Sequence, residues 1–299
     1  MAISGRVTEK SIHTRVLANL QRNLSKGERI QDQLSSGKQI NRPSDSPTGT
    51  VASMQLRAEN RLNSQYIRNA DDGLGWLSTV EGTLTNSSNL INRARDLTLQ
   101  GLNAGTNGPV ASEALASEID QIRESLISYA NTKYLDRPIF GGTTDGAVAY
   151  NSNGEYQGDG GKTERKVGAG EPVRVDTRGP DAFGADGSDS QLFKVLDSIA
   201  KNVKNRDTTQ LAIDLDNLDK AAVLMRTAIS GTGARYNRIT QMKDAAEDRV
   251  LSVTTQLSDI EDIDLPKTIM EMQLQQTSYQ AALAASAKVI QPSLIDFLR

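Results

Sequence analysis

The sequence predicts a mainly α-helical protein: an elongated helical bundle or coiled coil built from both ends of the chain, with a small β-rich, outward-facing domain inserted in the middle. Three observations lead to this fold class. Apolar residues recur every three or four positions toward both ends of the 299 residues, which is the period of an amphipathic helix. The stretch 141–190 is rich in Gly, Asp, Asn and Thr. Aromatic residues make up only 4% of the chain, so one thick spherical core is not expected.

The first predicted helix carries a heptad-like stripe with a weak middle. Its positions are Leu17, Leu20, Leu24, Gly27, Gln31 and Leu34. The run 35–37 ends this helix, and the turn-forming stretch 41–47 follows. Pro47 is suited to the first turn of the next helix, where Asp45 or Ser46 would be the N-cap.

Helical spacing continues over about 48–102, where Asp71, Asp72 and Gly73 indicate a break, and a third helix is expected over about 112–132. Beyond it, the alternating runs 165–167 and 172–175 predict short strands joined by tight turns. The pattern also predicts helices over 191–204, 208–230 and 234–263, with a break at 231–233.

The last predicted helix begins near Pro266, because proline is tolerated in a first turn but not in a helix interior. Its stripe consists of Leu265, Ile269, Met272, Gln276, Tyr279, Leu283, Ser286 and Ile290. After Pro292 an apolar tail contains Leu294, Phe297 and Leu298. The simplest architecture pairs the first helix with the last, although neighbouring subunits could also cover both stripes.

These elements predict five segments. Residues 1–45 form an N-terminal helix and linker that pairs with the C-terminal helix, and 265–299 form that helix. Residues 46–140 and 191–264 form the two parts of a helical bundle. Residues 141–190 form the β-rich insert between them.

Composition argues against several classes of function. The net charge of −3 offers no basic field for nucleic acid. Residues 1–40 carry +4 (seven Lys or Arg, three Asp or Glu), which leaves −7 elsewhere. That basic arm has a narrow apolar stripe without Trp or Phe, so a partner helix is favoured over a membrane surface. No secretory signal peptide is recognised, which fits either a cytoplasmic protein or an export route that uses no such signal.

Candidate chemistry is equally sparse. Cysteine is absent and His13 is the only histidine, so we expect no catalytic triad, metal site or cofactor, and no enzyme. The acidic turn residues of the insert do not have the spacing of an EF-hand loop. The carboxylates of Glu261 and Asp262 are expected on a solvated helix face.

Short motifs at both ends of the chain form a recognisable pattern. Asn41-Arg42-Pro43-Ser44-Asp45 separates the first two predicted helices, and Arg137-Pro138-Ile139-Phe140-Gly141-Gly142 leads into the insert. Tyr279-Gln280-Ala281-Ala282-Leu283 lies in the last helix, and 291–298 read Gln-Pro-Ser-Leu-Ile-Asp-Phe-Leu. Together these motifs resemble the flagellin superfamily over about 1–142 and 231–299, and within it the subunits of the hook–filament junction.

The resemblance implies a structural adapter of the bacterial flagellum, secreted unfolded through the flagellar type III export channel. It implies that the terminal helices pair as an inner coiled coil, that the subunits associate in a ring, and that hook-associated protein 1 and flagellin are the neighbours. An export chaperone would bind the C-terminal helix. The candidate interface residues are Leu17, Leu20, Leu24, Leu34, Asn41, Arg42, Pro43, Ile269, Met272, Tyr279, Leu283, Ile290, Leu294, Phe297 and Leu298.

Three other interpretations stay open at this point. A flagellin, the filament subunit itself, shares the same motifs but polymerises alone. An enzyme would need a site in the insert, which offers neither His nor Cys. A helical scaffold unrelated to flagella would satisfy the periodicity but not the motifs.

Overall fold

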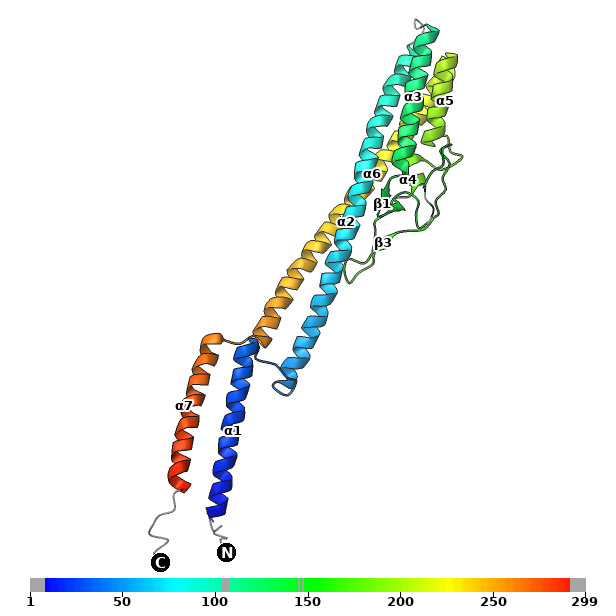
Figure 1. Ribbon diagram of the computed structural model, residues 1–299. Coiled ribbons are helices and arrows are strands. Elements are labelled where there is room, and N and C mark those ends of the chain that lie inside the picture. The colour runs from blue at the N-terminus through cyan, green and yellow to red at the C-terminus, as the bar shows by residue number, and fades with distance from the viewer. Residues whose placement is uncertain (1–8, 104–107, 145, 147, 291–299) are drawn as a thin grey trace, which may run out of the picture. The chain divides into compact units, whose positions relative to one another are not determined.

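The computed structural model describes residues 9–103, 108–144, 146 and 148–290 (Figure 1). In chain order the helices are α1 (Glu9–Ser36), α2 (Pro47–Leu102), α3 (Pro109–Ala130), α4 (Gly179–Phe183), α5 (Leu192–Asn205), α6 (Thr208–Glu261) and α7 (Leu265–Ile290). The strands are β1 (Lys133–Tyr134), β2 (Arg137–Pro138), β3 (Glu164–Arg165) and β4 (Val173–Arg174). The described residues are therefore mainly helical, as the sequence predicts.

The contacts divide the chain into two compact units. Unit 1 consists of residues 1–61 and 250–299, and unit 2 of residues 62–249. Helices α2 and α6 run through both units without interruption.

Unit 1 is built around α1 and α7, which run side by side in opposite directions (Figure 1). The Gln275 side-chain amide on α7 donates a hydrogen bond of 2.8 Å to the Asn23 carbonyl on α1. In unit 1 the first helix therefore lies against the last. Local signals also set the helix ends: Gly37 follows α1 with a φ of +70°, the conformation that glycine adopts without strain.

The start of α2 settles which of two residues is the cap. The Ser46 hydroxyl accepts a hydrogen bond from the Gly49 amide at 3.2 Å, so Ser46 is the N-cap. The Asp45 carboxylate instead accepts from the backbone amides of Asn41 and Arg42. Asp45 therefore closes the turn before the helix and does not cap it.

The predicted breaks at 71–73 and 231–233 are wrong, because α2 and α6 are continuous there. Gly73 lies against Val175 and Ile239, whose side chains would be 3.2 and 3.3 Å from an added Cβ atom. Glycine at that position permits close packing and does not end the helix. Within α6 the Thr232 hydroxyl donates a hydrogen bond to the Ala228 carbonyl.

Unit 2 has an extensive buried core between its stretches of α2 and α6, helices α3 and α5, and residues 133–191. Phe140, Phe183 and Phe193 are fully buried, and with Tyr150 they form edge-to-face and stacked ring pairs 5.0–5.7 Å apart. Such geometries stabilise a core beyond the area they bury.

Strand content in 141–190 is small. Within the described residues, β3 and β4 form a two-stranded antiparallel pair, with Glu164 opposite Arg174 and Arg165 opposite Val173. This pair falls where the sequence predicts strands. The other described residues of the segment form turns, bends, irregular backbone, α4 and an isolated antiparallel bridge between Tyr150 and Tyr156. Glycines 142, 154, 184 and 187 have positive φ angles, which suits turns better than extended ladders.

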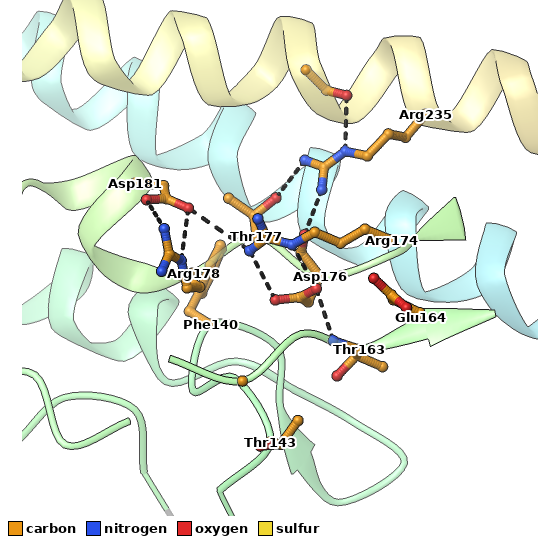
Figure 2. A network of polar contacts seen from close by, with 12 residues as sticks. Phe140, Thr143, Thr163, Glu164, Arg174, Asp176, Thr177, Arg178, Asp181 and Arg235 are labelled. Atoms are coloured by element: carbon orange, nitrogen blue, oxygen red, sulfur yellow. Dashed lines mark hydrogen bonds and ion pairs between the residues drawn. The ribbon is translucent and has the colours of Figure 1, made fainter. Parts of the chain in front are cut away.

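A buried polar network joins these turns to α6 (Figure 2). The fully buried Asp176 carboxylate accepts hydrogen bonds from the Thr163 amide at 3.0 Å and from the Arg174 guanidinium at 2.9 and 3.1 Å. On α6, Arg235 donates to the Asp176 carbonyl and to the Thr177 hydroxyl. Burial lowers the pKa of Arg235 below its usual range.

We expect Asp176→Asn to destabilise unit 2 by about 3 kcal/mol, because Arg174 would lose the charge that it is paired with in a buried site. Urea unfolding followed by near-ultraviolet circular dichroism, which reports on the buried aromatic rings, measures the change. Asp189→Asn, at an exposed carboxylate, is the matched control and is expected to change little. Equal midpoints for the two variants would contradict the role given to Asp176.

Candidate assembly interface

The contact between α1 and α7 is a heptad stripe with polar and small residues at its centre. On α1 the more buried positions step by four and three: Val16, Leu20, Asn23, Gly27, Ile30 and Leu34. On α7 they are Thr268, Met272, Gln275, Tyr279, Ala282 and Ser286. This spacing is that of a coiled-coil seam. Within it only Ile30, Thr268 and Gln275 are buried, so the seam covers its apolar groups incompletely.

The residues predicted at the interface fall into two groups. Leu20, Leu34, Met272 and Tyr279 lie half-buried in the seam. Leu17 and Leu24 on α1 and Ile269 and Leu283 on α7 are exposed by 59%, 51%, 42% and 43%. The chain therefore carries a second apolar stripe on each helix, one residue away from the seam on α1.

The structure does not describe the side chains of four further predicted residues. Ile290 ends α7, and its side chain is outside what the structure describes. Leu294, Phe297 and Leu298 lie outside the described residues.

Sequence reasoning missed part of the exposed apolar surface of α7. Met270 and Leu274 are 63% and 68% exposed. They lie off the stripe that periodicity selected. A different signal could have found Leu274: residues 272–287 contain no Asp, Glu, Lys or Arg. A surface helix without charge over four turns is typical of a face that a partner covers.

The linkers that flank the helix pair are joined by a short backbone ladder. The Gln39 amide donates to the Glu261 carbonyl at 2.5 Å, and the Ile263 amide donates to the Gly37 carbonyl at 3.2 Å. Asn41, Arg42 and Pro43 follow this ladder and are exposed. The ladder holds both linkers beside each other, so the turn that presents these three residues has a fixed base.

Four charged side chains surround this ladder. The Arg57 guanidinium donates to the Glu261 carboxylate at 2.7 Å, and Lys38 Nζ lies 2.5 Å from Asp262 and 3.7 Å from Glu261. The hydrogen bond from Arg57 holds the pKa of Glu261 below its usual range, with a smaller effect from Ser53 and Lys38. Hydrogen bonds from Lys38 and Ser258 lower the pKa of Asp262, and the Asp262 partner raises the pKa of Lys38.

The prediction that Glu261 lies on a solvated face is wrong, because its side chain is only 4% exposed. Helical spacing places Glu261 at the end of a polar run. Only the fold brings Arg57 and Lys38, about 200 residues earlier in the chain, to that carboxylate. Burial of a carboxylate is tolerated here because it is paired.

Within the described ranges, no group of three or more His, Cys, Asp or Glu side chains could hold a metal ion. No helix in the described part of the chain is long and apolar enough to span a bilayer. The exposed apolar side chains of α1 and α7 offer surfaces for protein contact.

Comparison with known proteins identifies relatives of both ends of the chain. The family model for the bacterial flagellin N-terminal helical region matches residues 7–144, and the model for the bacterial flagellin C-terminal helical region matches residues 215–298. Flagellar hook-associated protein 3 of Escherichia coli K12 is 28% identical over 277 residues, which covers 85% of this chain and 87% of that protein. Flagellin of Bacillus subtilis 168 is 27% identical over 92% of this chain and 93% of its own length.

Two solved structures have a similar fold. The structure of a flagellar hook-associated protein from Vibrio parahaemolyticus covers 73% of this chain and all of its own, with a TM-score of 0.67 at 21% identity. The crystal structure of Bacillus cereus FlgL covers 70% of this chain and all of its own, with a TM-score of 0.60 at 22% identity.

The ion pairs of Glu261 and Asp262 predict that the stability of the backbone ladder between the linkers depends on pH. In the folded chain the pKa values of Glu261 and Asp262 lie below their ordinary values of 4.5 and 3.8. The two ionised carboxylates therefore stabilise the fold fully above the ordinary pKa values. This stabilisation is lost as the pH falls through the lowered pKa values of the folded chain. Hydrogen exchange at the amides of Gln39 and Ile263, corrected for intrinsic rates, should show protection falling between about pH 5 and pH 3.

The double variant Glu261→Gln, Asp262→Asn is the control for that measurement. It should have weaker protection at pH 7 and little change on acidification, because neither side chain then titrates. Protection in the unaltered chain that is the same at pH 7 and pH 3 would contradict the ion-pair account of the ladder.

Proposed function

The chain belongs to the bacterial flagellin family, and we propose that it is the adapter subunit that joins the hook of the flagellum to the filament. The observation that carries this proposal is the match to flagellar hook-associated protein 3 over 85% of this chain and 87% of the relative. Two solved structures named as flagellar hook-associated proteins align over 100% and 98% of their own length and have a similar fold.

We further propose that the protein acts by contact alone, without catalysis. The unpaired apolar stripes of α1 and α7 support this role. Leu17, Leu24, Ile269 and Leu283 would be costly to leave in water, and among the described residues they are 42–59% exposed. Neighbouring subunits in a ring would bury them, and the incomplete seam would become complete only on assembly.

The partners follow from the position of an adapter. Hook-associated protein 1 lies on the hook side and flagellin on the filament side, and copies of this chain associate with one another between them. The exposed turn with Asn41, Arg42 and Pro43 is assigned to these subunit contacts, together with Leu20, Leu34, Met272, Tyr279 and Ile290 of the helix pair. An export chaperone would cover the charge-free face of α7 before secretion.

Flagellin is the second candidate, because the Bacillus subtilis flagellin aligns over 93% of its own length. The two functions differ in self-assembly: a flagellin forms long filaments alone, whereas an adapter requires hook and filament neighbours. They also differ in the phenotype of a cell that lacks the protein.

Deletion of the gene in its own host should leave hooks without filaments and release flagellin monomers into the medium. Electron microscopy of the cell surface and an immunoblot of the medium measure both effects. If flagellin is missing while the hooks still carry their junction proteins, this chain is the filament subunit. Intact motile flagella would refute both functions.

Removal of residues 297–299 should abolish incorporation at the hook tip, because Phe297 and Leu298 would no longer contribute apolar area to subunit contacts. An immunoblot of the medium shows whether the shortened chain is exported, and so it separates failed assembly from failed secretion. Removal of Arg299 alone is the control and should leave motility normal. Normal swimming after loss of all three residues would show that the tail is not an assembly contact.

A further inference from the structure

Two glycines in the middle of α6 have no packing role in the described part of the chain. Gly231 and Gly233 lie two residues apart within the continuous helix. A Cβ atom at Gly233 would meet nothing within 4 Å, and one at Gly231 would meet only Arg235 Nη2, at 3.9 Å. Neither glycine has a positive φ angle. Because glycine weakens a helix interior relative to alanine, these positions loosen α6 where nothing in the fold requires it.

A third glycine of this kind lies in α2. A Cβ atom at Gly82 would also meet nothing within 4 Å among the described residues. Other glycines of α2 differ, because an added Cβ atom at Gly73, Gly75 or Gly101 would lie 2.5–3.2 Å from a side chain. Close packing therefore explains those three glycines, but it does not explain Gly82.

Gly82 lies level with the two glycines of α6. Ion pairs on both sides of it set the register of the helices: Lys243 Nζ lies 2.7 Å from Asp71, and Arg95 Nε lies 2.7 Å from Asp219. In both pairs the two residue numbers add up to 314, because α2 and α6 run antiparallel (Figure 1). The same register places Gly82 opposite the glycines of α6, so both helices are loosened at one level of the pair.

Side-chain hydrogen bonds to the backbone occur at the same level. The hydroxyls of Thr83 in α2 and Thr232 in α6 each donate to the carbonyl four residues earlier, at 2.8 and 2.9 Å. Arg235 Nε also donates to the carbonyl four residues earlier, at 3.0 Å. Such bonds compete with the hydrogen bonds of the helix itself and often bend it. Both helices thus combine two features that favour bending.

Apolar packing at this level lies on one side of the helix pair. Val80 and Leu84 of α2 and Ala228 of α6 are buried in the core of unit 2, whereas Gly82 and Gly231 are exposed. A helix curves with its convex side toward water as the hydrogen bonds on that side lengthen, and glycine exposes the backbone to water. The buried side keeps its contacts while the exposed side opens.

We propose that α2 and α6 share a hinge at Gly82, Gly231 and Gly233, about which both helices bend together within unit 2. The hinge explains why the sequence predicts a break at 231–233 although α6 is continuous there. The glycines loosen the helix without ending it. An adapter that contacts unlike neighbours on its two sides has a use for such a bend, and this use alone rests on the proposed function.

Hydrogen exchange of the full-length chain, measured by mass spectrometry, tests the hinge. The amides of 231–237 form the hydrogen bonds that cross the glycine level of α6. After correction for intrinsic rates, we expect them to exchange about tenfold faster than those of 216–222 in the same helix, because local opening follows local helix stability.

A triple alanine variant, with Gly82→Ala, Gly231→Ala and Gly233→Ala, should remove this difference. It should also fold, because the added methyl groups have room. Gly170→Ala is the matched control, at an exposed glycine outside the helices whose surroundings are equally open. This control should leave the difference unchanged.

Spin labels measure the bend itself, because the chain has no cysteine of its own. Labels at Ala212→Cys and Gln241→Cys, two exposed positions, lie on either side of the glycine level and about 44 Å apart along a straight helix. Pulsed electron paramagnetic resonance should give a broad distance distribution that narrows in the triple alanine variant. Labels at Thr209→Cys and Arg226→Cys, both on one side of the level, should give a narrow distribution in both chains.

Exchange at 231–237 that is as slow as at 216–222 would overturn the hinge. So would a distance distribution across the glycine level that is as narrow as the control's, or one that stays broad in the triple alanine variant. If that variant straightens and is exported, but filaments no longer grow on the hooks, the use of the bend in assembly is supported. If filaments still grow, that use is refuted while the proposed function stands.

Discussion

The central constraint on unit 1 is that α1 and α7 meet along a seam too polar and too narrow to cover their apolar residues. Asn23 and Gly27 face Gln275 where a stable coiled coil would place Leu or Ile. Polar residues at seam positions lower the stability of a helix pair and select its register. The pair leaves apolar side chains exposed, and further surfaces that covered them would stabilise it.

Unit 2, in contrast, has an extensive buried core of its own. Its rings at Phe140, Phe183 and Phe193 are fully buried, and its one deeply buried carboxylate near them, Asp176, has charged and backbone donors. Three buried polar atoms of unit 2 (Trp76 Nε1, Tyr150 Oη and Thr163 Oγ1) have no hydrogen-bond partner, so its stability comes mainly from the apolar core. The chain thus separates stability from assembly: one unit supplies its own core, and the other keeps apolar surface for contact.

The linkers connect these properties to function. Glu261 is buried with Arg57 and Lys38 beside it, while the backbone of 37–39 pairs with that of 261–263. An ion pair of this kind is stabilising only while every member is present. The ladder gives the exposed turn at Asn41–Pro43 a fixed base, so a partner that bound there would not have to order a loop at a cost in entropy.

The sequence by itself determined the helix positions and several of their ends, because Gly37, Ser46 and Pro266 act through local backbone geometry. It also carried the motifs of the family. Tertiary structure alone decided which of two adjacent stripes on α1 forms the seam: Ile30 is buried there, and Leu17 and Leu24 are left exposed. It likewise buried Glu261 and kept α6 continuous through 231–233. Periodicity records which residues share a helix face, but a partner far away in the chain determines which face is covered.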